Sequence, residues 1–392
     1  MSYLSLFKVK WKKVLDIEEY IYSQMTWEER KKALYDSFML LFFRRPSIPD
    51  KHVITDFLFV KVMQRADYNK LFDQICSTCS EKKYSLNITY THSQHIRLYP
   101  LYIFIKYFPL LISKLKLNPI KSLYITYKMI QYLEVYEKLN NRISYKYLVV
   151  FADMQAIENL LIQMAKLKGI TTVTLQHGLY IDYTKMENIN SVNYKNHVAD
   201  FFLAWGNSTK ELIERFNPNA RVVICGKPLE AQDIPPQKSN YFTILFDQNL
   251  LKQYNHDLLK IAYDLHEKTQ LRINIRFHPH NRKSAYKIKK DIVYIDKELE
   301  SSVFILGHTT SLIHELLRMG IPVFKFNSDV PALDIPKALT FSNANDVEAI
   351  LKHYDLQKHN FVEDGQEFIS FIGEDSLQQC RNFFERLKNG KI

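Results

Sequence analysis

The chain has 392 residues, and both glycine and cysteine are scarce in it. Its nine glycines form neither a G-x-G-x-x-G fingerprint nor a Walker A loop, which argues against a dinucleotide-dependent oxidoreductase and a P-loop NTPase. Of the four cysteines only Cys76 and Cys79 form a close pair, so neither a disulfide framework nor a four-cysteine zinc site is indicated. We therefore expect reduced thiols and a cytoplasmic protein.

Long apolar runs are also missing. No stretch of about 18 consecutive apolar residues occurs, so no segment is expected to span a bilayer. Lys8, Lys10, Lys12 and Lys13 interrupt the start of the chain, and we expect no signal peptide. No D-x-D motif follows an early strand, so no metal site of that type is indicated, and we expect no cofactor.

The charge balance is positive, with 53 Lys and Arg against 42 Asp and Glu and a formal net charge of +11. This balance favours acidic partners, such as phosphorylated substrates or an anionic membrane surface. The basic residues are scattered and match no nucleic-acid-binding signature, so nucleic acid is not an expected partner. The length favours two domains, and a hydrophobic content of 46% is that of a globular protein.

Strand and helix patterns alternate from about residue 145 onward. Residues 147–151 and 171–175 are short apolar runs rich in β-branched side chains, and residues 154–168 between them have a helical pattern. Such a βαβ unit predicts parallel strands with a right-handed crossover. Further along, Ser208 with Glu211 predicts a capping box at the start of a helix. We therefore predict an α/β protein with two Rossmann-like domains facing a cleft, and with extra amino-terminal helices.

The same patterns suggest where the domains begin and end. Residues 1–230 are expected to form an amino-terminal domain, helical up to residue 145 and clearly α/β after it. A proline-containing linker over residues 231–240 leads to a second α/β domain at 241–375, and a final helix occupies 376–392.

Residues 99–117 are rich in aromatic and aliphatic side chains, with Lys106, Lys114 and Lys116 between them. Because proline lacks a backbone N–H, Pro100 and Pro109 are expected to prevent one unbroken helix. Two interpretations remain open. The segment is either a buried pair of helices or an interfacial segment on an anionic lipid surface, where Tyr and Lys suit the headgroup region.

Three places beyond predicted strands could hold a ligand, because open parallel sheets bind ligands past the carboxyl ends of their strands. The first is Gln176-His177-Gly178, directly after the strand at 171–175. Gly178 would let the backbone turn tightly, and a neutral His177 could take a proton from a hydroxyl. The alternative is a loop histidine that only bonds to the backbone.

The second place is Arg276-Phe277-His278-Pro279, at the end of a predicted strand. Arg276 and His278 lie two residues apart and share one face of a strand, where two cations suit a phosphate or pyrophosphate. Pro279 would stop the strand and fix the direction of the loop. The alternative is a solvated basic strand end.

The third place is the turn Gly307-His308-Thr309-Thr310-Ser311, which leads from a predicted strand into a helix. Hydroxyl side chains and backbone N–H groups at a helix start suit an anion. Glu315 lies one helical turn further on and could reach ribose hydroxyls. Ordinary helix capping would explain the Thr and Ser residues equally well.

Taken in this order, the three places resemble the GT-B glycosyltransferase fold, and in particular bacterial teichoic-acid glycerophosphotransferases and related capsule or lipopolysaccharide transferases. In that group an H-G turn lies in the acceptor domain. An R-x-H-P strand end and a Ser/Thr-rich turn before a helix ending G-x-P lie in the donor domain. The matching residues here are Gln176 to Gly178, Arg276 to Pro279, and Thr309 to Ser311 followed by Gly320-Ile321-Pro322. Bacterial sialyltransferases share the H-P and Ser-Ser elements, but Thr-Thr replaces the commoner Ser pair here, and their acidic motif is not evident.

The resemblance covers about residues 145–352 and implies a role for each motif. His177 would be the catalytic base, with Gln176 and Gly178 on the acceptor side. Residues 241–375 would bind the donor nucleotide. His278, Thr309, Thr310 and Ser311 would hold the donor's phosphates, and Glu315 would bind ribose. The other donor-binding residues would be Arg276, Pro279 and Gly307.

The resemblance also implies an activity. We expect metal-independent, inverting transfer of a sugar or polyol phosphate from a CMP-, CDP- or UDP-type donor to a hydroxyl of a growing capsule or lipopolysaccharide glycan. The acceptor would be a glycan or a lipid-linked molecule. The protein would be cytoplasmic and peripheral at the inner face of the plasma membrane. Two alternatives remain: a sugar-nucleotide 2-epimerase on the same fold, or a non-catalytic protein that binds a membrane surface.

Overall fold

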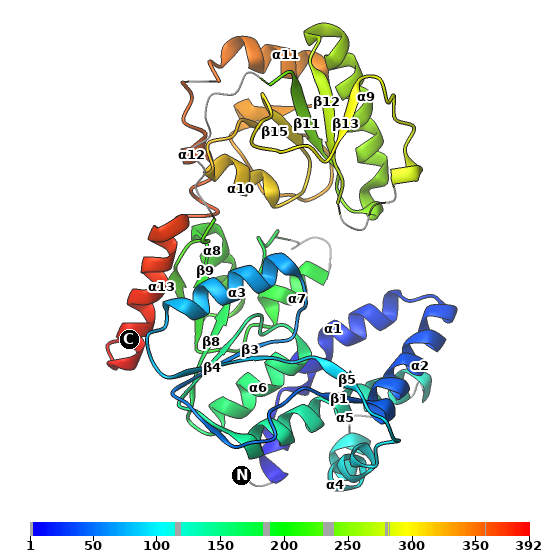
Figure 1. Ribbon diagram of the computed structural model, residues 1–392, viewed down its shortest axis with the longest axis vertical. Helices are drawn as coiled ribbons and strands as arrows, with labels where there is room; N and C mark the ends of the chain where they lie inside the picture. Colours follow the sequence, from blue (N-terminus) through cyan, green and yellow to red (C-terminus); the bar gives the residue numbers. More distant parts are fainter. Residues whose placement is uncertain are drawn as a thin grey trace.

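The computed structural model contains two six-stranded parallel sheets, one in each of two stacked domains (Figure 1). The expected α/β class, with two Rossmann-like domains and extra amino-terminal helices, is confirmed. The structure describes residues 3–113, 119–182, 189–229, 239–278, 281, 283–356 and 358–392.

The amino-terminal sheet is built from strands that are mostly short and buried. They are β3 (Phe57–Lys61), β4 (Lys83–Asn87), β7 (Tyr147–Val150), β8 (Thr171–Leu175), β9 (Phe201–Ala204) and β10 (Arg221–Ile224). Their order is β10-β9-β8-β7-β3-β4, and every neighbouring pair is parallel. All five residues of β3 are buried, as expected for a strand covered on both faces. The covering helices include α3 (Ala66–Thr78), α6 (Ala156–Lys166), α7 (Ile189–Lys195) and α8 (Asn207–Phe216).

The carboxy-terminal sheet repeats this plan. Its strands are β11 (Tyr241–Leu245), β12 (Arg272–Arg276), β13 (Val293–Ile295), β14 (Ile305–Gly307), β15 (Val323–Phe326) and β16 (Thr340–Phe341). They run in the order β13-β12-β11-β14-β15-β16, again with every pair parallel. Its helices are α9 (Lys252–Thr269), α10 (Leu312–Arg318), α11 (Ala344–His353) and α12 (Phe361–Asp364), with short 3-10 turns η2 (Asn249–Leu251), η3 (Lys283–Ala285) and η4 (Lys337–Leu339).

A unit of four helices extends from one side of the amino-terminal domain, and we call it the helical unit (Figure 1). It consists of α1 (Trp11–Gln24), α2 (Trp27–Phe43), α4 (Tyr99–Ser113) and α5 (Pro119–Arg142), with a 3-10 turn η1 (Tyr3–Lys8) before it. Two small ribbons join the unit to the domain: β1 (Arg44–Pro46) with β5 (Tyr90–His92), and β2 (Val53–Ile54) with β6 (Ile143–Ser144). Thr26 and Glu29 form a capping box that starts α2. No described helix is both long and apolar enough to cross a membrane.

Helix α4 corrects one expectation. Pro109 lies inside a helix that the structure describes as continuous from Tyr99 to Ser113, so the two prolines do not divide it. Pro100 sits in the first turn, where its missing N–H costs nothing. Pro109 removes one internal hydrogen bond, and we attribute the survival of the helix to the packing of its buried face. Lys114 and Lys116 lie outside the described residues.

After α12 the chain returns to the amino-terminal domain and ends there as α13 (Gly373–Lys388). Phe383 and Phe384 of α13 pack against Phe201 and Phe57, with ring centroids 5.5 and 5.7 Å apart. The other connection between the domains contains residues 230–238, which lie outside the described residues. This gap includes most of the expected linker.

The returning chain presses against the start of α8. A Cβ atom on Gly206 would lie 2.4 Å from the Glu367 carbonyl oxygen, and the Ser208 N–H donates to the same oxygen at 3.2 Å. The helix therefore begins at Asn207 with Gly206 as its N-cap, and no side-chain cap is present. The predicted capping box of Ser208 and Glu211 is wrong, because a carbonyl from a distant segment satisfies the backbone instead.

Candidate active site

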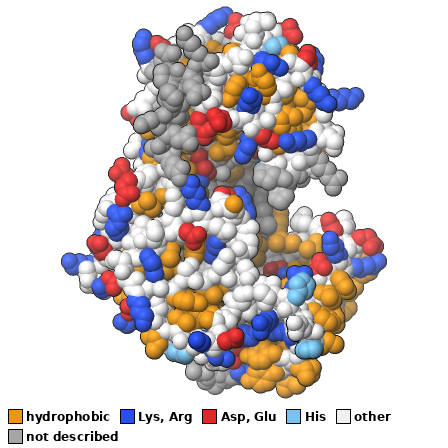
Figure 2. Space-filling model, viewed as in Figure 1, with side chains coloured by type: hydrophobic (Ala, Val, Ile, Leu, Met, Phe, Trp, Pro, Cys, Tyr) orange, Lys and Arg blue, Asp and Glu red, His pale blue; other side chains and the backbone are white. Residues whose placement is uncertain are grey.

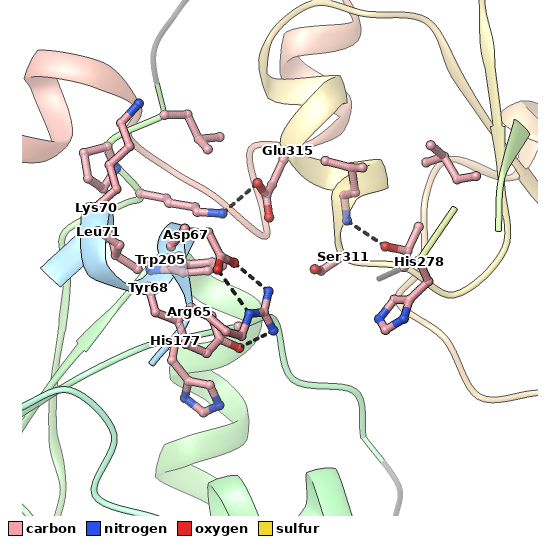
Figure 3. Close-up of a pocket in the computed structure, with 18 of the residues that line it drawn as sticks. Arg65, Asp67, Tyr68, Lys70, Leu71, His177, Trp205, His278, Ser311 and Glu315 are labelled. Carbon is pink, nitrogen blue, oxygen red and sulfur yellow. Dashed lines mark hydrogen bonds and ion pairs between the residues drawn. The ribbon is translucent and has the colours of Figure 1, made fainter. Parts of the chain in front are cut away.

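The carboxyl ends of the two sheets open into one cavity of about 940 Å³ between the domains (Figure 3). The amino-terminal domain contributes Arg65, Asp67, Tyr68, Lys70, His177, Gly178, Trp205 and Lys227. The carboxy-terminal domain contributes Phe246, Arg276, Phe277, His278, Thr310, Ser311 and Glu315. All three places singled out in the sequence therefore reach the same cavity. Within the described part of the chain, no group of three or more His, Cys, Asp or Glu side chains could hold a metal ion.

His177 lies two residues beyond β8, at the floor of the cavity and beneath Arg65 and Tyr68 (Figure 3). Only 8% of the residue is exposed, and burial lowers the pKa of its imidazole to about 4. The ring is therefore neutral at physiological pH. Its Nδ1 lies 3.3 Å from the Tyr180 hydroxyl, and the Tyr68 ring meets it edge-on at 6.1 Å.

The two neighbours of His177 have different roles from each other. Gln176 is fully buried, and its amide donates to the Gly178 carbonyl at 2.8 Å and to the Thr209 hydroxyl at 3.0 Å. Its side-chain oxygen accepts the Trp205 N–H at 2.6 Å. Gln176 thus ties the end of β8 to the end of β9 and holds His177 in place. Gly178 lines the cavity, but its φ is not positive and a Cβ there would contact nothing within 4 Å, so the backbone does not require glycine.

Arg65 is a site residue that the sequence reasoning missed. It precedes α3, and its guanidinium donates to both carboxylate oxygens of Asp67, at 3.1 and 2.6 Å. It also donates to the Tyr68 hydroxyl at 3.1 Å and lies 4.1 Å from the centre of that ring. The residue follows β3 along the chain, so applying the strand-end rule to this strand as well would have found it.

Lys227 was also missed, although it follows β10 in the same way. Its Nζ lies 2.6 Å from Glu315 Oε2 of the other domain and 4.5 Å from the centre of the Trp205 ring. The side chains of Lys227 and Glu315 are only 17% and 18% exposed. The expected ribose-binding Glu315 is therefore held by an ion pair that crosses the cavity.

Arg276 and His278 line the carboxy-terminal wall, and only Arg276 belongs to β12. Arg276 is half exposed, with one guanidinium nitrogen 3.7 Å from Asp296. Lys283 shares the Asp296 carboxylate at 2.8 Å, so this acid partly offsets both cations. Pro279 lies outside the described residues.

The turn between β14 and α10 is held from behind by Asp247, another residue that the sequence reasoning missed. Asp247 Oδ2 accepts the Thr309 N–H at 3.0 Å and lies 3.1 Å from His308 Nδ1. His308 Nε2 lies 2.6 Å from the Ser328 hydroxyl. This relay joins three strand ends, since Asp247 follows β11 and Ser328 follows β15.

The same turn presents its hydroxyls to the cavity. Thr310, Ser311 and Glu315 line the wall, whereas Gly307 and Thr309 support the turn. A Cβ on Gly307 would lie 2.8 Å from two Ile313 carbons, so glycine allows α10 to pack closely on β14. Ser311 precedes α10 without a side-chain capping bond, and its hydroxyl faces the cavity (Figure 3).

Comparison with known proteins shows what the chain resembles. No protein-family model and no curated protein sequence matches it. The UDP-N-acetylglucosamine 2-epimerase of Rickettsia bellii is 14% identical, and the match covers 86% of this chain and 96% of that one at a TM-score of 0.52. The UDP-GlcNAc 2-epimerase of Methanocaldococcus jannaschii, solved with UDP-GlcNAc and UDP, is 13% identical and covers 84% of this chain and 99% of its own at 0.54.

A third structure, the wall teichoic acid polymerase TagF, is 11% identical over 97% of this chain and 98% of its own, at a TM-score of 0.47. A score below 0.5 does not by itself establish a shared fold. The two epimerases do establish it: the chain has the GT-B type of fold, with two Rossmann-like domains facing a cleft, as expected.

Proposed function

We propose that the protein is a GT-B-type transferase, which moves a sugar or a polyol phosphate from a nucleotide-activated donor to a hydroxyl of a surface glycan. One observation carries the proposal. A single cavity between the domains joins a neutral, buried histidine of one domain to the cations and hydroxyls of the other. The histidine suits a hydroxyl acceptor, and the cations and hydroxyls of the other domain suit a phosphorylated donor.

The carboxy-terminal wall would hold the donor's phosphates. Arg276 and His278 supply N–H donors there, and Thr310 and Ser311 supply hydroxyls. Lys227 would join them from the opposite domain, because its Nζ already reaches this wall at Glu315. Glu315 keeps one carboxylate oxygen for a ribose hydroxyl while the other faces Lys227.

His177 would act as the general base of the proposed reaction. If its Nδ1–H donates to the Tyr180 hydroxyl oxygen, Nε2 keeps a lone pair for the acceptor proton. The acceptor oxygen then bonds to the donor's anomeric carbon, or to phosphorus in a polyol phosphate. The bond from that atom to the nucleotide's phosphate oxygen breaks, and the nucleotide leaves with the electron pair. Attack opposite the leaving group would invert an anomeric carbon.

Two electrostatic effects would support this step. The bound donor brings negative charge near His177, which raises the imidazole's pKa from about 4 toward the range of an effective base. The cations on the far wall would stabilise the charge that builds on the departing phosphate, as preorganised donors do in other active sites. No bound metal is required for either effect in this proposal.

The acceptor and compartment are parts of the same proposal. We place the acceptor among capsule or lipopolysaccharide glycans, free or lipid-linked, because a growing glycan offers the hydroxyl that the reaction consumes. We place the protein in the cytoplasm because all four cysteines are buried free thiols, as is usual in reducing compartments.

A 2-epimerase is the second candidate, and the fold shared with two such enzymes favours it. An epimerase would consume one nucleotide-sugar and need no acceptor. The two candidates therefore separate in one assay, in which the nucleotide-sugar is supplied with and without a glycan acceptor. Nucleotide release that depends on the acceptor supports transfer, and a changed sugar without an acceptor supports epimerisation.

The first experiment is a thermal-shift screen with CMP, CDP, UDP and GDP, and with the matching nucleosides as controls. A nucleotide at about 100 times its Kd should stabilise the protein by roughly 2.7 kcal/mol. Because the proposed contacts are to phosphates, the nucleosides should give a much smaller shift, and Arg276→Met should reduce the nucleotide's shift. Equal shifts with the nucleosides, or no shift with any of the four nucleotides, would contradict the donor site.

A further inference from the structure

Helix α4 is apolar apart from Lys106 and Ser113, yet the described chain covers only one of its faces. Ile103, Tyr107, Leu110 and Leu111 are buried against the rest of the helical unit. The opposite face forms one continuous stripe with the residue that leads into the helix. The stripe consists of Leu98, Leu101, Tyr102, Ile105 and Phe108, which are 45% to 73% exposed. A helix that is apolar all round is normally buried on all sides or in contact with lipid.

The stripe belongs to a wider apolar surface on the helical unit and on residues 93–98 before α4. The described chain has 15 exposed large apolar side chains, and only Phe7, Ile54, Leu167 and Ile295 lie elsewhere, which leaves 11 on this unit. They include Trp27, Tyr35 and Phe38 of α2. Figure 2 shows apolar side chains gathered along the lower edge and lower right of the molecule, where α4 and α2 lie. A concentration of this kind marks an interaction surface.

The charges around this surface indicate its partner. Residues 82–142 contain ten Lys and Arg residues but only two acids, Glu134 and Glu137. Arg97 pairs with Glu134, and Lys106 with Glu137, so the acids are already engaged inside the unit. Helix α2 is balanced in charge, since it exposes Glu28, Glu29 and Asp36 beside Lys31 and Lys32, and the exposed Arg44 and Arg45 follow it. An apolar stripe within a region of net positive charge complements the surface of an anionic lipid bilayer, which has anionic headgroups over an apolar interior.

We propose that the α4 stripe docks on an anionic lipid bilayer, with the helix lying in the plane of the interface. Fifteen helical residues are about 22 Å long, which is shorter than the roughly 30 Å hydrocarbon core, so the helix lies on the bilayer rather than across it. The stripe would enter the headgroup boundary, and the basic side chains would contact anionic headgroups.

A second copy of the chain fits this surface less well. Pairing two copies through the stripe would bring two regions of net positive charge together, and like charges facing each other oppose association. The bilayer proposal is also independent of the proposed reaction. The stripe residues do not line the cavity, so vesicle binding and nucleotide binding can fail separately.

The test is co-sedimentation of the full chain with vesicles of phosphatidylcholine, alone or with about one-third phosphatidylglycerol. The test variant is Leu101→Glu with Ile105→Glu. The matched control is Leu167→Glu with Ile295→Glu, which places the same charges on exposed apolar positions elsewhere. Circular dichroism and melting curves of both variants check that each is folded, and analytical ultracentrifugation gives their oligomeric states.

We expect the wild type and the control to bind the anionic vesicles, and to bind neutral vesicles or anionic vesicles at high salt much less. The stripe variant should lose roughly tenfold or more in partition coefficient, because each glutamate opposes both the apolar and the electrostatic contact. Two results would overturn the proposal: equal binding by wild type and stripe variant, or no vesicle binding at low salt. A wild-type dimer that the stripe variant abolishes, without vesicle binding, would assign the surface to a second copy.

Discussion

Lys227 and Glu315 join the two domains across the cavity between them, with Nζ and Oε2 2.6 Å apart. Each residue is largely shielded from solvent and each lies on a different wall of the cavity. Lys227 is also fixed from behind, since its N–H donates to Phe371 on the returning chain at 2.9 Å. The pair therefore sits where the two domains can influence each other through a shared ligand.

The first prediction concerns the strength of this ion pair. A double-mutant cycle of Lys227→Met and Glu315→Gln should give a coupling energy of about 1–2 kcal/mol in urea unfolding, because the charges interact with little solvent screening. The pair of Lys352 and Glu348 is the control, with Lys352 74% exposed. Its cycle should give less than about 0.5 kcal/mol. Similar coupling in both pairs would show that shielding does not strengthen the Lys227–Glu315 contact.

The second prediction concerns His177. His177→Ala should lower turnover by about 100-fold with little change in donor affinity, because the base acts on the acceptor. Tyr180→Phe keeps the ring packing but removes the hydroxyl near Nδ1, and its effect should be smaller, under about tenfold. Steady-state kinetics with a saturating donor measure both. Near-normal turnover of the alanine variant would remove His177 from the mechanism.

The same histidine predicts a pH profile for the free enzyme. A base must be unprotonated to act, and the pKa of His177 is about 4 in the ligand-free protein. The value of kcat/KM should therefore stay level as pH falls from 8 to about 6 and decline only on approach to pH 4. An acid limb near pH 6.5, which His177→Ala removes, would show an imidazole that is much better solvated than the structure indicates.

The third prediction concerns acid stability. His314 of α10 is buried against Phe368, its Nδ1 has no hydrogen-bond partner, and burial lowers its pKa to about 3. Between pH 6.5 and 3 the unfolded chain binds a proton that the folded protein excludes. Stability is therefore complete above pH 6.5 and falls as pH decreases, by up to about 1.4 kcal/mol per pH unit for this group.

His314→Leu should flatten that decline, whereas His95→Asn, at an exposed histidine, should leave its slope unchanged. Free energies of unfolding from urea titrations at pH 7, 6 and 5 measure the slopes directly. His177 contributes to the decline in the same direction, so some slope should remain in the leucine variant. Identical slopes in wild type and His314→Leu would contradict the predicted burial of a neutral ring.

The fourth prediction concerns Asp247. One of its carboxylate oxygens serves both the Thr309 N–H and His308, so an amide in its place would leave at least one of them poorly satisfied. Asp247→Asn should cost about 1–3 kcal/mol of stability and weaken nucleotide binding through the displaced turn. Ser328→Ala removes only the exposed end of the relay and should cost less. Isothermal titration with the best nucleotide from the screen compares the two variants.

The fifth prediction uses two glycines as a matched pair. Gly226 has φ +75°, and a Cβ there would lie 2.1 Å from the Phe371 carbonyl oxygen. Gly226→Ala should therefore destabilise the protein by about 2 kcal/mol or more and disturb Lys227 beside it. Gly178→Ala meets no such obstacle and should change stability by less than about 0.5 kcal/mol. Thermal and urea unfolding measure both.

Sequence reasoning worked best where a strand is short, apolar and bounded by polar residues. The strand at Thr171–Leu175 has the predicted limits, because a short β-branched apolar run of this kind suits a buried parallel strand. It failed at β4, where Lys83–Asn87 contains a single buried residue and reads as a polar segment. That strand is held by its pairing with β3, which periodicity alone does not reveal.

The site was predictable in part for a similar reason. The predicted His177, Arg276, His278, Thr310, Ser311 and Glu315 all line the cavity, because strand ends of parallel sheets meet at one edge. Arg65, Lys227 and Asp247 were not found, although they also follow strands. Their partners lie 2 to 88 residues away, and Lys227 and Glu315 meet only because the domains face each other. No pattern of neighbouring residues in the sequence predicts such a contact.

The position of α13 has a consequence for how the protein is made. Helix α13 supplies Cys380, Phe383, Phe384 and Leu387 to the core beneath β3 and β9, so the amino-terminal domain is incomplete until α13 has been synthesised. The carboxy-terminal domain has all its strands by Phe341. The usual order on the ribosome, in which the first domain folds first, is therefore reversed for the final step of this chain. A released fragment that stops before Gly373 should hold a folded second domain beside an unfinished first one.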